Sequence, residues 1–188
     1  VRPWIIPFFS GLGLGYMFFE IVLMHELVLF FGHPIFAAAA VISALLIFSG
    51  LGSLCSHRFT AGPANHARAA LLVSLLLLLY FFFLQPVLNA AIGLGTGWKI
   101  SVFLAMVAPP AFAMGMPFPL GLAKLAGYSR SQAAWAWGIN GCVSVVSAGL
   151  AAIIAVELGF AAVMLTACLA YGMAFLAGIR TEKRVMVS

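Results

Sequence analysis

The chain has 188 residues, of which 65% are hydrophobic and only 7% are charged, and its formal net charge is +5. A soluble domain carries about a quarter charged residues, so this composition excludes a water-soluble globular protein. It predicts an all-α, polytopic membrane protein. The positive charge needs no nucleic-acid partner, because basic residues that flank membrane segments face anionic lipid headgroups.

Six apolar segments reach the length of about 20 residues that a helix needs to cross a bilayer. Short linkers that contain glycine or proline separate them, among them residues 32–34, residues 93–99 and the hinge at residues 157–159. No linker is long enough to form a soluble domain, so we expect one transmembrane domain over residues 1–188. The predicted spans are residues 7–31, 34–55, 69–92, 100–122, 133–156 and 160–179.

The basic residues divide unequally between the two sides that six spans define. Lys99 lies on one side, and the other eight of the nine basic residues lie on the side of the two termini. Linkers rich in lysine and arginine remain in the cytoplasm. We therefore expect both termini in the cytoplasm, in a bacterial inner membrane. The eight are Arg2, Arg58, Arg68, Lys124, Arg130, Arg180, Lys183 and Arg184.

The first predicted span contains three ionisable residues, Glu20, His25 and Glu26. At about 100° per residue they point in three directions, which leaves no broad apolar face for lipid. We therefore expect other helices, or another protein, to enclose this span. As sequence neighbours, His25 and Glu26 are not expected to face each other. Glu26 lies roughly 7–8 Å from the outer end, so we expect it at the membrane interface or beside Lys99.

Glu20 lies near the middle of the same span, and no lysine or arginine lies at its depth in any predicted span. An ionisable group at this depth is costly and rarely lacks a partner or a function. Two roles are open for Glu20: a hydrogen bond to another helix, or the binding of a cation or a proton. His25 is expected to be a packing residue. The histidines and cysteines lack metal-ligand spacing, so we expect neither a metal nor another cofactor.

Prolines interrupt the fourth predicted span, at Pro109 and Pro110 and again at Pro117 and Pro119. Because proline lacks an N–H donor, we expect this helix to be kinked or unwound at mid-depth. Broken helices mark the binding site in many transporters, although a packing kink is the alternative. In the third span, Gln85 and Asn89 flank Pro86 and are expected to satisfy backbone groups that the proline frees.

Small residues predict close contacts between helices, at Gly11 and Gly15 in the first span and at Gly138 and Gly141 in the fifth. Asn140 lies between the last two glycines and is expected to form a hydrogen bond across such a contact. The candidate substrate or proton site therefore comprises Glu20, His25, Asn140, Pro109 and Pro110.

Four stretches together resemble the membrane region of the spermidine-synthase-like integral membrane proteins. They are residues 15–20 (GYMFFE), 29–34 (LFFGHP), 115–122 (GMPFPLGL) and 135–141 (WAWGING). The resemblance implies a bundle similar to one half of a major-facilitator transporter. In that family the unit is often fused to an aminopropyltransferase-like domain. This sequence contains no glycine-rich nucleotide turn and no acidic catalytic pair, so we do not expect an enzyme.

Two functions of different classes remain. The first is a membrane module that forms half of a transporter and binds or moves a cation or an amine, with Glu20 and the broken fourth span at its site. The second is a non-catalytic accessory subunit of a larger respiratory or photosynthetic membrane complex, in which Glu20 holds a contact. In both cases the expected partners are the lipid bilayer and either another membrane protein or a second copy of the chain.

Overall fold

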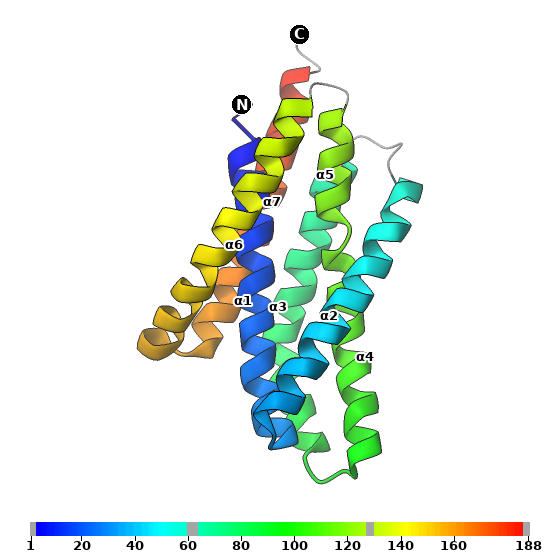
Figure 1. The fold of residues 1–188 in the computed structure, drawn as a ribbon, viewed down its shortest axis with the longest axis vertical. Helices are drawn as coiled ribbons and strands as arrows, with labels where there is room; N and C mark the ends of the chain where they lie inside the picture. The colour runs from blue at the N-terminus through cyan, green and yellow to red at the C-terminus, as the bar shows by residue number, and fades with distance from the viewer. Residues whose placement is uncertain (1–2, 60–63, 127–129, 186–188) are drawn as a thin grey trace.

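A computed structural model describes residues 3–59, 64–126 and 130–185. Within these ranges the chain is helical and contains no strand, and six helical segments are long and apolar enough to cross a membrane. The predicted class, a six-span all-α membrane protein, is confirmed (Figure 1). The helices are α1 (Ile5–Phe31), α2 (Pro34–Ser56), α3 (Asn65–Ala91), α4 (Thr96–Met114), α5 (Pro117–Ala126), α6 (Arg130–Leu158) and α7 (Phe160–Val185), with a 3-10 turn η1 (His57–Phe59) after α2.

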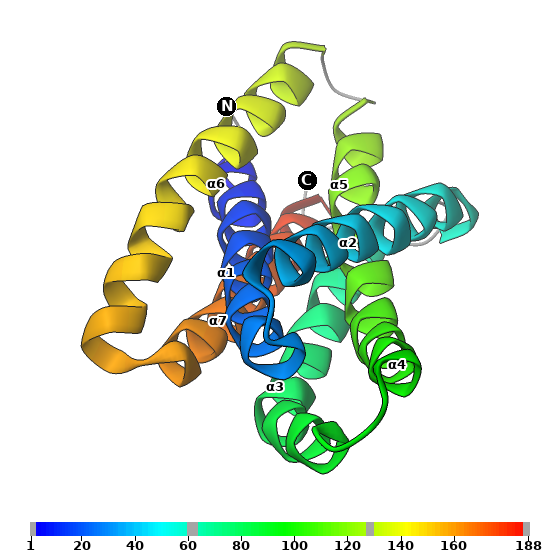
Figure 2. The same ribbon diagram turned by 60° about the horizontal axis from the view of Figure 1, so that its bottom comes forward.

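The first helix is enclosed by the rest of the bundle. It packs against α7, α6 and α2, and in Figures 1 and 2 it runs through the middle of the molecule. Among its large hydrophobic residues only Ile6 and Leu29 are exposed, whereas Phe8, Phe9 and Phe19 are fully buried. The expectation that this helix is surrounded by others is therefore confirmed, and the helices that α1 contacts belong to this chain.

Glycines allow α1 to approach α7 closely. A Cβ atom at Gly11 would lie 2.5 Å from the carbonyl oxygen of Ala170, and one at Gly15 would lie 2.6 Å from the ring of Tyr171. These two predicted packing glycines therefore occupy a close helix crossing, where a larger side chain would collide with α7.

The other two predicted packing glycines do not make such a contact within this chain. A Cβ atom at Gly138 or Gly141 would meet open space. The reason is the position of α6, which follows one edge of the bundle down to its turn into α7 (Figure 2). It turns Asn140 and Ser144 toward Gly13 of α1, so its glycines point away from the core.

The fourth span is broken once, at residues 115–116, between α4 and α5. Pro109 and Pro110 lie inside the continuous helix α4, so the expectation of a break at these residues is wrong. Pro117 instead begins α5, where the first helical residue needs no N–H donor and proline is well suited. The Gly115 N–H, at the break, donates to the carbonyls of Ala111 and Phe112.

Helices α2 and α4 cross at this break. A Cβ atom at Gly52 would overlap the carbonyl oxygen of Phe112, and one at Gly115 would overlap the carbonyl oxygen of Ser49. The backbones of the two helices therefore touch at this depth, and only glycine fits at either position.

The ends of the bundle are defined by its turns. The start of α1 and the end of α7 lie at one end, and the turns between α1 and α2, α3 and α4, and α6 and α7 lie at the other (Figure 1). Gly32 and Gly159 end α1 and α6 with φ angles of 74° and 83°, a left-handed conformation that favours glycine. The three turns thus place the end of α1, the end of α3 and the start of α7 in the half of the bundle that is remote from the termini.

Candidate functional site

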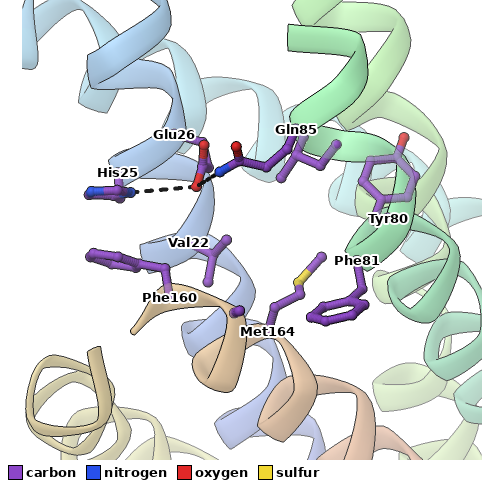
Figure 3. Close-up of a pocket in the computed structure, with 10 residues that line it drawn as sticks. Val22, His25, Glu26, Tyr80, Phe81, Gln85, Phe160 and Met164 are labelled. Atoms are coloured by element: carbon purple, nitrogen blue, oxygen red, sulfur yellow. Dashed lines mark hydrogen bonds and ion pairs between the residues drawn. The ribbon is translucent and has the colours of Figure 1, made fainter. Parts of the chain in front are cut away.

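A pocket with a volume of about 300 Å³ opens between α1, α3 and α7, in the half of the bundle that is remote from the termini (Figure 3). This volume is at the lower end of the range of small-molecule sites. Its walls are mostly apolar, with three polar side chains on one side. The lining residues are Val22, His25, Glu26, Tyr80, Phe81, Leu84, Gln85, Phe160, Ala161 and Met164.

Glu26 supplies the negative charge of this pocket. Its side chain is only 10% exposed, and its Oε1 atom accepts a hydrogen bond of 2.9 Å from Nε2 of Gln85. Glu26 is therefore buried among the helices of this chain, and the expectation that it lies at the membrane interface stays a prediction. Tertiary packing is the cause of this burial, because α3 and α7 cover the face of α1 that carries it.

Lys99 does not pair with Glu26. Its ammonium group donates to the carbonyl oxygen of Phe30 at 3.1 Å and lies 5.1 Å from the centre of the Phe30 ring. The carbonyl belongs to the last turn of α1, which has no helical N–H partner of its own. Lys99 thus stabilises the end of α1 and leaves the Glu26 carboxylate without a lysine partner.

His25 lies beside Glu26, contrary to the expectation that the two side chains point apart. Its Nδ1 atom is 3.6 Å from Oε1 of Glu26, and its ring stacks on Phe160 with centroids 3.6 Å apart and an interplanar angle of 14°. Phe160 is the first residue of α7, so the α6–α7 turn holds the imidazole in place. Among the described residues, the buried Nδ1 atom has no hydrogen-bond partner.

The remaining polar group at the pocket points away from it. The Tyr80 hydroxyl donates to the carbonyl oxygen of Met106 on α4, and Figure 3 shows it directed away from Met164 and Phe160. Tyr80 therefore contributes its ring to the wall and its hydroxyl to the packing of α3 on α4. The pocket thus combines one carboxylate, one neutral amide and one imidazole with aromatic and aliphatic walls.

This combination suits a positively charged ligand. The carboxylate accepts hydrogen bonds and does not donate them, and among the described residues no lysine or arginine forms an ion pair with it. Aromatic faces also attract cations, and Phe81 and Phe160 both line the pocket. Among the described residues, no group of three histidine, cysteine, aspartate or glutamate side chains is placed to hold a metal ion.

The structure does not bring the five predicted site residues together. Only His25 lines the pocket. Asn140 on α6 donates from Nδ2 to the carbonyl oxygen of Phe9 at 3.1 Å, near the end of α1 that is remote from the pocket. Pro109 and Pro110 belong to α4, the first exposed and the second buried.

Glu20 lies half-buried in the middle of α1 and outside the pocket. In the described part of the chain, no hydrogen bond or ion pair holds its carboxylate. The nearby Tyr16 interacts with both Glu20 and Ser49 of α2, so the carboxylate lies on the side of α1 that faces α2. This is also the depth at which Ser49 meets the break between α4 and α5.

Gln85 is a pocket residue whose contact the sequence analysis did not predict. It was expected to satisfy the backbone around Pro86, but it binds Glu26. One signal points to this pair: Glu26 lies five residues and Gln85 seven residues from the end of its predicted span that is remote from the termini, so the two residues have similar depths. A comparison of the depths of the polar residues in the predicted spans would have indicated the contact between Glu26 and Gln85.

Fold and pocket define a multi-pass helical membrane protein with a buried carboxylate in a small, largely apolar pocket. No protein-family model, no curated protein and no solved structure matches the chain.

Proposed function

We propose that this protein is a membrane module that binds a cation or an amine in the Glu26 pocket and forms one half of a transporter. The observation that carries the proposal is the Glu26 carboxylate, which is 10% exposed and has only an amide and an imidazole beside it. A buried ionisable group in a membrane segment is costly and is retained where it serves a function. A bound cation supplies the missing positive charge.

The position of the pocket supports transport. It lies in the half of the bundle that contains Lys99 and no other described lysine or arginine, and the positive-inside rule favours the outer side for that half. The bundle also has a broken span at α4–α5, a feature that lets some transporters change conformation around a bound substrate. The site would then load from outside, past the partly exposed His25 and the exposed Gln85.

The test is ligand binding to the full chain in lipid nanodiscs, measured by calorimetry with sodium, potassium, tetramethylammonium and simple alkylammonium ions. We expect at least one of these cations to bind, and Glu26→Gln to weaken that binding about 10- to 100-fold, since a hydrogen bond to a charged group contributes about 1.5–3 kcal/mol. Glu20→Gln is the matched control and should bind as the parent does. Uptake of the bound cation into proteoliposomes then tests transport.

Two outcomes contradict this proposal. If Glu26→Gln binds the cation as tightly as the parent does, the pocket is not the binding site. If none of these cations binds, the proposed cation-binding function is wrong.

A second function, that of an accessory subunit in a larger membrane complex, is favoured by Glu20. This mid-span carboxylate is half-buried and has no hydrogen bond or ion pair within the described residues, so a partner is needed to cover it. Under this function Glu20→Gln reduces assembly while Glu26→Gln does not. Co-purification in mild detergent, with the mass of the complex measured by light scattering, separates the two proposals.

A further inference from the structure

The pocket has only one carboxylate, and this limits the charge of its ligand. Glu26 is the only acidic residue among the ten that line it. A ligand with a second ammonium group would place that group against Phe81, Leu84 or Met164, or beside the His25 imidazole. None of these side chains carries a negative charge, so the second charge would lose its hydration without compensation.

The Gln85 amide adds a requirement for N–H donors. Because a carboxylate only accepts hydrogen bonds, Gln85 presents its NH₂ group to Glu26, and this orients its carbonyl oxygen as a second acceptor. Gln85 is exposed, and among the described residues its side chain is hydrogen-bonded to Glu26 through Nε2 only. A ligand that donates to both the carboxylate and the amide oxygen satisfies the pair. A quaternary ammonium has no N–H and can donate a hydrogen bond to neither oxygen.

The other walls fit an apolar group of limited size. Val22, Leu84 and Met164 provide aliphatic surface, and Phe81 and Phe160 provide aromatic surface. A volume of about 300 Å³ equals that of roughly ten water molecules at about 30 Å³ each. This is enough for a short alkyl chain or a single ring beside the ammonium group.

We infer that the ligand is a small primary ammonium ion with one apolar substituent, and that the pocket rejects diamines and quaternary ammonium ions. This inference rests on the proposed function and specifies its substrate class. Glu26 binds the charge, and Gln85 acts as the specificity-determining residue, because a site built to hydrogen-bond a polar group discriminates strongly against an analogue that lacks it.

The experiment compares three ligands of matched chain length on the full chain in nanodiscs: butylammonium, butyltrimethylammonium and putrescine. We expect butylammonium to bind at least about tenfold more tightly than either of the others, which corresponds to about 1.4 kcal/mol. The Gln85→Met variant keeps the length of the side chain and removes its acceptor. It should reduce the preference for butylammonium over butyltrimethylammonium.

Asn89→Met is the control, because Asn89 is an exposed amide one turn further along α3 and does not line the pocket. It should keep the parental preference. Equal or tighter binding of putrescine or butyltrimethylammonium overturns the inference while the proposed function stands. If Gln85→Met keeps the parental preference for butylammonium over butyltrimethylammonium, Gln85 does not determine the specificity. If no cation binds at all, both the inference and the proposed function are overturned.

Discussion

The Gln85 side chain on α3 donates a hydrogen bond of 2.9 Å to the Glu26 carboxylate on α1, across a separation of 59 residues. Two polar side chains in a bundle with mostly apolar helix faces thereby satisfy each other. The bond ties α1 to α3 at a place where these helices make few other contacts, and it sets the polar wall of the pocket. The bond therefore serves both the packing of α1 against α3 and the arrangement of the site.

This pair should be energetically coupled. We expect Gln85→Leu to destabilise the protein, because it leaves a buried carboxylate without its donor, and Glu26→Leu to cost less. Hydrogen bonds between membrane helices contribute about 0.6 kcal/mol on average and up to about 1.7 kcal/mol in double-mutant cycles. A cycle of the two single variants and the double variant, unfolded with SDS in mixed micelles, measures the coupling. A coupling energy of zero would contradict the structure.

The crossing of α2 and α4 should be intolerant of even one methyl group. Gly52→Ala places a Cβ atom on the carbonyl oxygen of Phe112, and neither backbone can yield without opening the crossing. Overpacking of this kind costs about 1–3 kcal/mol. Thermal unfolding in detergent should therefore show a clear loss of stability.

Gly138→Ala on α6 is the matched control for Gly52→Ala, since a Cβ atom there meets open space. Alanine favours the helical state over glycine by about 1 kcal/mol, so this variant should be as stable as the parent or slightly more so. A strong loss of stability on Gly138→Ala would show instead that this glycine packs against a partner.

The pocket should face the outside of the cell. Single cysteines introduced at Thr96 and at Ser131, both exposed and at opposite ends of the bundle, report this orientation after the native Cys55, Cys142 and Cys168 have been replaced. A membrane-impermeant maleimide added to intact cells should label Cys at position 96 and not at position 131. The reverse pattern would place both termini outside.

The apolar composition and the lengths of the apolar segments determined the class of this protein by themselves. Lengths of apolar sequence predict six spans because a helix must satisfy its own backbone groups across the full width of the hydrocarbon core. The helical repeat of about 100° per residue also predicts that α1 is enclosed, since Glu20, His25 and Glu26 point in three directions. The prolines of the fourth span likewise predict a break, because proline lacks the N–H that a helix interior needs, but they do not distinguish Pro117, where α5 begins, from Pro109 and Pro110, which lie inside α4.

Only the tertiary structure decided which polar residues form a site. The helical repeat along α1 predicts that the side chains of His25 and Glu26 point apart. The first residue of α7, Phe160, nevertheless holds the imidazole beside the carboxylate. Gln85 reaches Glu26 because α3 packs against the same face of the bundle, and Glu20 is excluded because it faces α2. Distances between helices depend on how their surfaces fit together, and no single helix contains that information.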